Sequence, residues 1–214
     1  MKYFQIPVNP FAMNCYIYYD ENSKEGVIFD PAVYTSDEEA TIKKLIEDNG
    51  INIKYIINTH GHIDHIMGNK FAKDYFNVPI FMNEKDMPFY KNIQKQAGMY
   101  GLAIDELPPV DEFIDENSKI SVGDIEFKIL HTPGHSPGSL TFIDDKYKNI
   151  FCGDVIFKDS IGRTDLMFGD YKELMNSINN ILLPQVGDDY TLLPGHMETT
   201  TVGREKKLNP FIAA

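Results

Sequence analysis

His60-Gly61-His62-Ile63-Asp64-His65 is the stretch of this sequence that decides the fold, because its six residues carry three imidazoles and a carboxylate. Three later stretches repeat its setting. In each, a short apolar segment reaches a glycine turn, and the turn delivers His135, Asp154 or His196. In α/β proteins, ligands collect beyond the carboxyl ends of the strands. The sequence therefore predicts that four strand ends meet around metal.

Composition limits the classes of protein to which the chain can belong. It has 214 residues, of which 43% are hydrophobic and 24% charged, as is typical of a soluble globular protein. A net charge of −12 argues against a nucleic-acid partner, which needs a basic patch, and against an anionic membrane surface. No segment approaches the roughly 20 apolar residues of a membrane span. We expect a small-molecule substrate, no nucleic acid and no membrane, with a homodimer as a further expectation.

The cysteines and the amino terminus bear on the compartment. Cys15 and Cys152 lie far apart and imply no disulfide framework, which fits a reducing compartment. Residues 1–7 lack the apolar run of a signal peptide. We therefore expect a cytoplasmic protein. Since no linker composition separates domains, residues 1–214 are predicted to form a single domain.

Apolar periodicity predicts strands followed by helices, twice over. The predicted strands are Tyr3–Val8, Cys15–Tyr19, Val27–Phe29, Ile53–Asn58, Val78–Met82, Ile120–Val122, Ile125–Leu130, Leu140–Ile143, Asn149–Cys152 and one from Thr191 towards His196. The predicted helices run from a capping box at Ser36 to Asn49, from Asp64 or His65 onwards, from Tyr171 to Pro184 and over about Thr199–Leu208.

Residues 83–110 are less regular, and we predict a helical insertion or lid there. This stretch carries the exposed-looking aromatic residues Phe89, Tyr90 and Tyr100. They could line a substrate pocket or a dimer contact, and the sequence favours neither.

The spacing within the histidine cluster indicates two ions rather than one. His60 and His62 are two apart in an extended segment, so both point towards one ion. Asp64 and His65 lie where the chain turns into a helix, so His65 points elsewhere. Two directions from one segment suit two neighbouring ions.

The remaining donors complete the set. His135 and His196 each stand alone on a turn, one for each ion, and Asp154 has two oxygens with which to bridge. Seven donors for two ions leave room for water, which marks a catalytic site. Imidazole and carboxylate without thiolate favour zinc, iron or manganese over calcium and magnesium, and zinc is our first expectation. The sixth histidine, His131, is expected to stabilise its turn or to orient a ligand.

Two other pairs of residues could have functional roles, but structural roles explain them more simply. Cys152 and Cys15 lie among apolar neighbours and are expected to be buried structural thiols. Arg163 and Asp165 are expected to form an ion pair that fixes their loop. The rival reading gives Arg163 a substrate carboxylate.

The cluster, with the later His and Asp turns in their order, resembles the signature of the metallo-β-lactamase superfamily. Further stretches resemble its glyoxalase II-like (hydroxyacylglutathione hydrolase-like) branch. They are Asn14-Cys15-Tyr16, Phe29-Asp30-Pro31, Leu130 to Ser136, Gly153-Asp154, Gly162 to Leu166, Pro194-Gly195-His196 and Glu205 through Asn209-Pro210-Phe211. We expect no counterpart of the carboxy-terminal helical domain that helps glyoxalase II to hold glutathione, so the short, single-domain members match better. Met197-Glu198 also departs from the Gly-Pro pair that is common after this histidine.

The resemblance implies an α/β fold, a four-layer αββα sandwich of two mixed β-sheets flanked by helices, with the site at one edge. It also implies a division of the donors between two metals. The first takes His60, His62 and His135, the second takes Asp64, His65 and His196, and Asp154 bridges them.

Donor set and resemblance together predict a metal-dependent hydrolase of thioesters or related esters. Two cations lower the pKa of a shared water towards ~7, so that a metal-bridging hydroxide can attack the carbonyl. Asp64 is expected to orient this nucleophile. The alternatives are a persulfide dioxygenase-like oxygenase with one iron, a lactonase or β-lactamase of the same fold, and a non-catalytic metal-binding module.

Overall fold

The computed structural model describes residues 1–212, and their contacts divide the chain into two compact units. The first unit comprises Met1–Ile114 and Ser121–Ile125. The second comprises Asp115–Ile120 and the described residues from Glu126 onwards. Each unit has its own sheet and its own apolar core.

The sheet of the first unit is mixed. Its strands, in spatial order, are β1 (Lys2–Val8), β2 (Met13–Tyr19), β3 (Glu25–Phe29), β4 (Asn52–Ile57), β5 (Ile80–Met82) and β6 (Glu112–Phe113). Strands β1 to β3 pair antiparallel, whereas β3 to β6 pair parallel. All seven residues of β2 are buried, so this strand lies at the centre of the core rather than at its surface.

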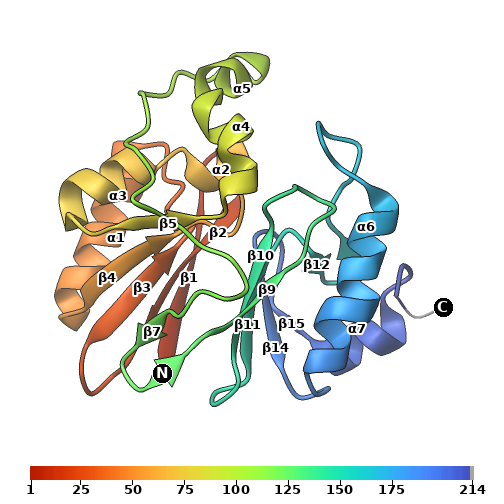
Figure 1. Ribbon diagram of the computed structural model, residues 1–214. Helices are drawn as coiled ribbons and strands as arrows, with labels where there is room; N and C mark the ends of the chain where they lie inside the picture. Colours follow the sequence, from red (N-terminus) through yellow and green to blue (C-terminus); the bar gives the residue numbers. More distant parts are fainter. Residues whose placement is uncertain (213–214) are drawn as a thin grey trace. The chain divides into compact units, whose positions relative to one another are not determined.

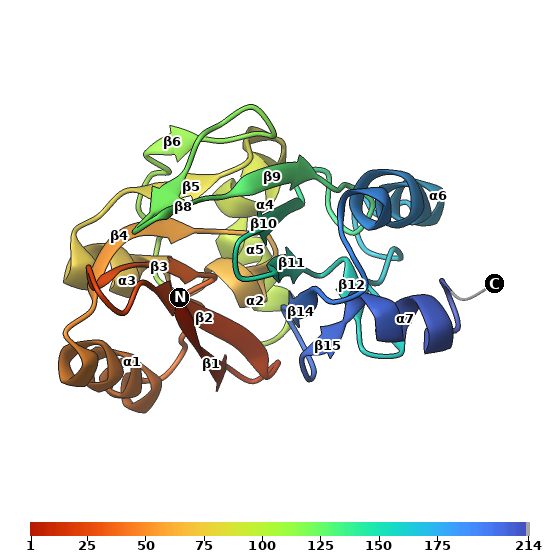
Figure 2. The same ribbon diagram turned by 90° about the horizontal axis from the view of Figure 1, so that it is seen from below.

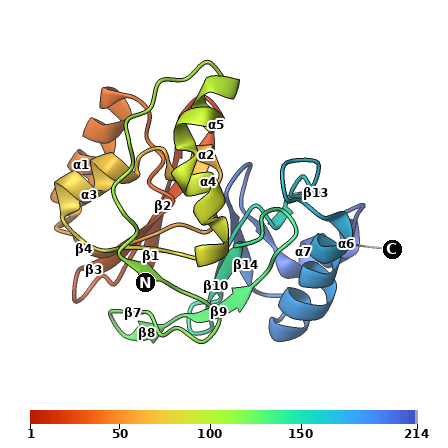
Figure 3. The ribbon, with the colours of Figure 1, turned by 45° about the horizontal axis from the view of Figure 1, so that its top comes forward.

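Helices flank this sheet. They are α1 (Ser36–Asn49), α2 (Ile63–Ile66), α3 (Asn69–Phe76), α4 (Met87–Lys91) and α5 (Ile93–Met99), with a 3-10 turn η1 (Glu84–Asp86) before α4. Helices α1 and α3 lie on the same side of the sheet (Figure 1). Helix α2 contacts both α4 and α5, and the three lie together in Figure 3. The stretch 83–110 therefore contains two short helices packed beside the helix that carries Asp64 and His65.

The capping box of α1 lies one residue earlier than the sequence pattern suggested. Thr35, not Ser36, is the N-cap, and its hydroxyl accepts the N–H of Glu38 while the Glu38 carboxylate accepts the N–H of Thr35. Both residues fit the motif equally well, because each is followed three residues later by a glutamate. Gly50 ends the helix with a φ of 63°, as expected.

The second unit has a mixed sheet of five strands. In spatial order they are β15 (Thr200–Thr201), β14 (Thr191–Pro194), β11 (Asn149–Gly153), β10 (Leu140–Asp144) and β9 (Lys128–His131). In this unit β12 (Ile156–Phe157) pairs with β13 (Ser160–Ile161), whereas β7 (Ser121–Val122), which belongs to the first unit, pairs with β8 (Ile125–Glu126). Helix α6 (Tyr171–Asn176) continues as a π-helical stretch η2 (Ser177–Leu182) and a 3-10 turn η3 (Leu183–Gln185), and α7 spans Val202–Leu208. Both α6 and α7 lie on the same side of this sheet (Figure 2).

The predicted α/β class with two mixed sheets and flanking helices is confirmed. The short strands β6, β12, β13 and β15 were not predicted, because two residues are too few to show a period. Within residues 1–212, no helix combines the length and apolar character needed to cross a bilayer.

Candidate metal centre

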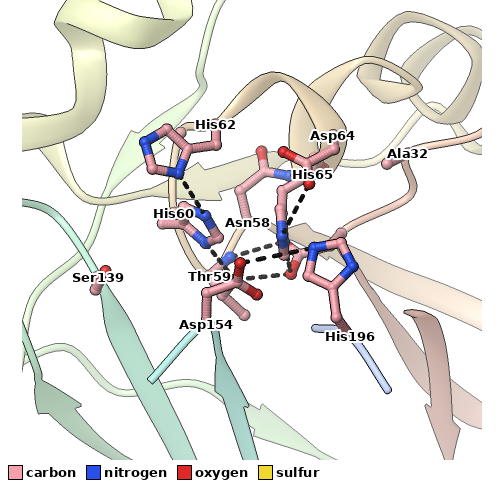
Figure 4. A network of polar contacts seen from close by, with 12 residues as sticks. Ala32, Asn58, Thr59, His60, His62, Asp64, His65, Ser139, Asp154 and His196 are labelled. Carbon is pink, nitrogen blue, oxygen red and sulfur yellow. Dashed lines mark hydrogen bonds and ion pairs between the residues drawn. The ribbon is translucent and has the colours of Figure 1, made fainter. Parts of the chain in front are cut away.

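One donor cluster lies at the carboxyl ends of three parallel strands of the first unit. Because β3, β4 and β5 run in the same direction, Asp30, the segment 58–65 and the segment 83–86 leave the sheet at the same edge. This cluster, which we call the first donor cluster, comprises His60, His62, Asp64 and His65, and Figure 4 shows the four side chains gathered there. His60, His62 and His65 are buried.

His60 and His62 face each other within this cluster. Nε2 of His60 lies 3.1 Å from Nδ1 of His62, and the two rings are nearly perpendicular (Figure 4). The ring of Phe89 packs edge-on against His62, with 4.7 Å between the ring centroids. Phe89 and Tyr90 are thus buried, contrary to their exposed appearance in the sequence, whereas Tyr100 is exposed.

Asp30 fixes the orientation of His65. Oδ2 of Asp30 lies 2.9 Å from Nδ1 of His65, and the same carboxylate accepts the backbone N–H and the hydroxyl of Thr59 at 2.8 and 2.7 Å. The other ring nitrogen of His65, Nε2, faces Oδ2 of Asp64 at 3.9 Å. A carboxylate on the far nitrogen is the usual partner of a metal-ligating imidazole, because it sets both the tautomer and the ring direction.

The backbone of the first donor cluster is held by side chains from the stretch 83–110. Oδ2 of Asp86 accepts the N–H of Gly61 at 2.7 Å, and Oε1 of Gln96 accepts the N–H of Ile63 at 3.2 Å. A Cβ on Gly61 would lie 2.9 Å from both the Cβ and the carbonyl oxygen of Asp86, so the close approach requires glycine. The stretch 83–110 thus holds the backbone of residues 61–63 in place.

The second unit gathers a second donor cluster, which comprises His135, Asp154 and His196. Strands β11 and β14 run parallel, so Asp154 and His196 leave their sheet at one edge. Nε2 of His135 lies 3.5 Å from Oδ2 of Asp154. Nε2 of His196 lies 3.6 Å from the same oxygen, and Figure 4 shows these two side chains facing each other. Nδ1 of His135 donates to the carbonyl of Arg163 at 2.7 Å, which fixes the direction of its ring.

The spacing of donors within each cluster fits a divalent cation. Two donors held tetrahedrally about 2.1 Å from one ion stand about 3.4 Å apart. The donor pairs given above are 3.1 and 3.9 Å apart in the first cluster and 3.5 and 3.6 Å apart in the second. The donors are imidazole and carboxylate, the set that zinc, iron and manganese accept.

His131 has a local role. Its Nε2 lies 2.8 Å from the carbonyl of Pro137, so it stabilises the turn that presents His135, one of the two roles expected for it.

The predicted Arg163–Asp165 ion pair is confirmed, with two contacts of 2.7 and 2.8 Å. The hydrogen bonds from Arg163 lower the pKa of Asp165 to about 2.

Both cysteines are buried free thiols, as predicted. Burial raises the pKa of Cys152 to about 12 and raises that of Cys15 well above its usual value. The thiolate is the reactive form of cysteine. Neither residue is therefore suited to act as a nucleophile or as a metal ligand at neutral pH.

Sequence reasoning missed the side chains that hold the first donor cluster in place. Asp30 had a signal, since it follows a strand and precedes a proline just as the ligand segments follow theirs. Asp86 and Gln96 had none, because they lie in a stretch without clear periodicity. Their contacts with Gly61 and Ile63 span 25 and 33 residues.

Known proteins with similar sequences belong to the superfamily that the sequence motifs resemble. The family model of the metallo-beta-lactamase superfamily matches residues 8–196. Hydroxyacylglutathione hydrolase GloC of Haemophilus influenzae is 40% identical over 209 residues, which cover 97% of this chain and 96% of that protein.

Two crystal structures are similar over nearly the whole chain. That of the BLEG-1 B3 metallo-beta-lactamase gives a TM-score of 0.90 at 32% identity and covers 100% of both chains. That of TTHA1623 in a di-iron-bound form gives a TM-score of 0.86 at 32% identity and covers 97% of this chain and 99% of the other. These similarities concern the complete fold and not a shared motif alone.

Proposed function

Because the chain belongs to the metallo-beta-lactamase superfamily and is a hydrolase of that superfamily, we propose that it cleaves thioesters or related esters with the help of two divalent cations. The observation that carries this proposal is the similarity to a hydroxyacylglutathione hydrolase along 97% of the chain. The donor spacing within each cluster supports it independently.

We assign both donor clusters to the cations. His60, His62 and His135 would hold one cation, Asp64, His65 and His196 would hold the other, and Asp154 would serve both. Zinc suits these nitrogen and oxygen donors, and so does iron, which the similar protein TTHA1623 holds as a pair.

The residues of the chain have separate tasks in this proposal. When bound, divalent cations supply hydroxide at neutral pH by lowering the pKa of water towards ~7, and they polarise the carbonyl. Asp30 and the carbonyl of Arg163 hold His65 and His135 in the ligating orientation. The Asp64 carboxylate orients the attacking water. A thiolate leaving group has a low proton affinity and needs little help from a general acid.

The composition and the thiols support a proposal for the substrate class and the location. A net charge of −12 supports a small-molecule substrate over nucleic acid. The buried free thiols of Cys15 and Cys152 support a reducing, cytoplasmic location. A homodimer stays a prediction, to be tested by the mass in solution.

The second candidate is hydrolysis of a β-lactam or lactone ring. The 32% identity to a B3 metallo-beta-lactamase along the complete chain favours it. The one-iron persulfide dioxygenase remains the alternative outside hydrolysis. Oxygen uptake with glutathione persulfide, and one rather than two metals per chain, would distinguish it.

The test is a substrate panel given to the metal-loaded protein. We expect turnover of S-lactoylglutathione or of thioesters of other thiols, and slower turnover of β-lactams and lactones. A preparation that carries two metals and leaves every thioester intact would overturn the proposal.

Asp64→Asn is the variant that tests the site. The neutral amide is a poorer ligand than the carboxylate, so we expect an unchanged fold, the loss of one metal and a fall in kcat of at least about 100-fold. Circular dichroism measures the fold, elemental analysis the metal content and steady-state kinetics the kcat. Asp105→Asn, which changes an exposed aspartate of the same unit, should behave as the unmodified protein. Normal metal content and turnover in Asp64→Asn would refute the assigned role.

A further inference from the structure

Two loops of the second unit present large apolar side chains next to predicted ligands. Met197 follows His196 directly, and its side chain is 55% exposed. Met167 and Phe168, which are 60% and 55% exposed, lie in the loop that joins β13 to α6. Single exposed apolar residues are ordinary on a protein surface. Here Met197 adjoins His196 in sequence, and the loop of Met167 and Phe168 is hydrogen-bonded to the turn of His135.

Both ends of the loop between β13 and α6 are tied to the turn of His135. At one end, Nδ1 of His135 donates to the carbonyl of Arg163 at 2.7 Å. At the other end, the N–H of Asp170 donates to the carbonyl of Gly134 at 2.8 Å. The loop is therefore held in a fixed position relative to a predicted ligand.

Two of the three apolar residues have backbone conformations that disfavour them. The φ angle is 65° at Phe168 and 68° at Met197, in the left-handed region where glycine is at ease and bulky side chains are not. Strained residues of this kind concentrate at functional sites. Both positions carry a large apolar side chain where glycine would relieve the strain.

We propose that Met167, Phe168 and Met197 form an apolar rim that selects thioesters with an apolar acyl chain. The inference rests on the proposed thioester hydrolysis and names its substrate class. Biological thiols that carry acyl groups bear carboxylates or phosphates, whose burial against methionine and phenylalanine would be costly. The acyl chain is thus the part of the substrate that suits this rim.

Kinetics with an acyl series test the rim. The probes are thioesters of N-acetylcysteamine with acyl chains from acetyl to octanoyl, given to the metal-loaded protein. Complete burial of a methylene is worth about fourfold in affinity, so partial burial at an open rim should raise kcat/KM by about twofold for each added methylene. Phe168→Ala and Met197→Ala should flatten this slope. Leu208→Ala, which removes an exposed apolar side chain from α7, should leave the slope unchanged.

A glycine variant separates the side chain from the backbone. Met197→Gly removes the side chain and the strain together, so it should lose the same chain-length preference as Met197→Ala while its Tm rises above that of Met197→Ala. A purely structural role would change Tm and leave the chain-length preference as it was. A slope that survives in Phe168→Ala and in both Met197 variants would overturn the proposal. So would a preference that follows the thiol rather than the acyl group in a second series with a fixed acetyl group.

Binding of inert probes tests the rim without turnover. The methyl groups of Met167 and Met197 can be labelled with ¹³C and assigned through Met167→Ala and Met197→Ala. S-octyl-N-acetylcysteamine, a thioether that cannot be hydrolysed, should shift both signals and bind at least tenfold more tightly than the S-ethyl analogue. If the probes bind but no thioester is hydrolysed, the apolar rim is supported and the proposed function is refuted. If thioesters are hydrolysed but neither methyl signal shifts, the proposed function is supported and the apolar rim is refuted.

Discussion

At the scale of single residues, the candidate metal centre depends on the direction of each imidazole. His65 shows the principle, since Asp30 holds one ring nitrogen and thereby turns the other towards Asp64. The sequence could single out the seven candidate donors because histidines are few in this chain and their spacing is distinctive. Asp30 was not predicted as a partner of His65, because its contact spans 35 residues and depends on two strands being neighbours.

Asp30→Asn should weaken metal binding while preserving the fold. The amide can still accept the N–H of Thr59, but it orients the imidazole of His65 less strongly than a carboxylate does. Loss of such a partner typically costs 10- to 100-fold in metal affinity. Competition with a chelator of known affinity measures the change.

Asp20→Asn is the matched control for that measurement. Asp20 is also a buried carboxylate that accepts backbone N–H groups, those of Asn22 and Ser23, but it lies in a turn after β2 that carries no predicted ligand. Equal metal affinity in Asp30→Asn and the unmodified protein would show that Asp30 is not needed to orient its neighbour.

At the scale of elements, the segment after the first donor cluster departs from the sequence prediction. One helix was expected from Asp64 or His65 onwards, whereas α2 ends at Ile66 and α3 begins at Asn69. Gly68 explains the break, because a Cβ there would lie 1.8 Å from the carbonyl oxygen of Pro31. The sequence around Gly68 has helical periodicity, but the chain at Pro31 packs so closely there that one continuous helix does not form.

Gly68→Ala should therefore destabilise the protein by about 3 kcal/mol, at the upper end of what overpacking costs. Gly98→Ala is the control, since its Cβ would meet nothing within 4 Å and it lies inside helix α5. That change should raise the stability by about 0.5 to 1 kcal/mol through helix propensity. Unfolding in guanidinium chloride measures both variants. If the two variants changed the stability equally, the close approach of Pro31 would not be what requires glycine at position 68.

The start of α7 is fixed by the buried carboxylate of Glu205. It accepts hydrogen bonds from the hydroxyl of Thr200, the backbone N–H of Asp159, the guanidinium of Arg204 and the amide of Asn209. Burial alone would raise the pKa of Glu205, but these hydrogen bonds outweigh it and lower the pKa below its usual 4.5. A lowered folded-state pKa contributes stability that is complete above the unfolded-state value and is lost as the pH falls through the folded-state value.

Glu205→Gln should accordingly lower the stability by about 2 kcal/mol at pH 7 and by much less at pH 3. Unfolding free energies of the variant and the unmodified protein at the two pH values give the comparison. Glu126→Gln, in an exposed strand position of the same unit, should show neither effect. An undiminished difference at pH 3 would mean that the charge of Glu205 does not contribute.

At the scale of the whole molecule, the resemblance to the metallo-β-lactamase superfamily implied the fold class, and the turns that carry His and Asp predicted the donor set. Strand β4, which precedes the histidine cluster, pairs parallel with β3, and β11, which precedes Asp154, pairs parallel with β14, which precedes His196. The sequence did not predict the loops that surround the donors. Their conformations depend on contacts such as that between Gly169 and Thr164, where a Cβ would lie 2.5 Å from a carbonyl oxygen.

The metal content of the purified protein tests the central claim that seven side chains hold a pair of divalent cations. After equilibration with zinc and removal of free metal, elemental analysis should give two ions per chain, and about one ion per chain for His196→Ala. Less than one ion per folded chain of the unmodified protein, or two ions retained in His196→Ala, would contradict the account.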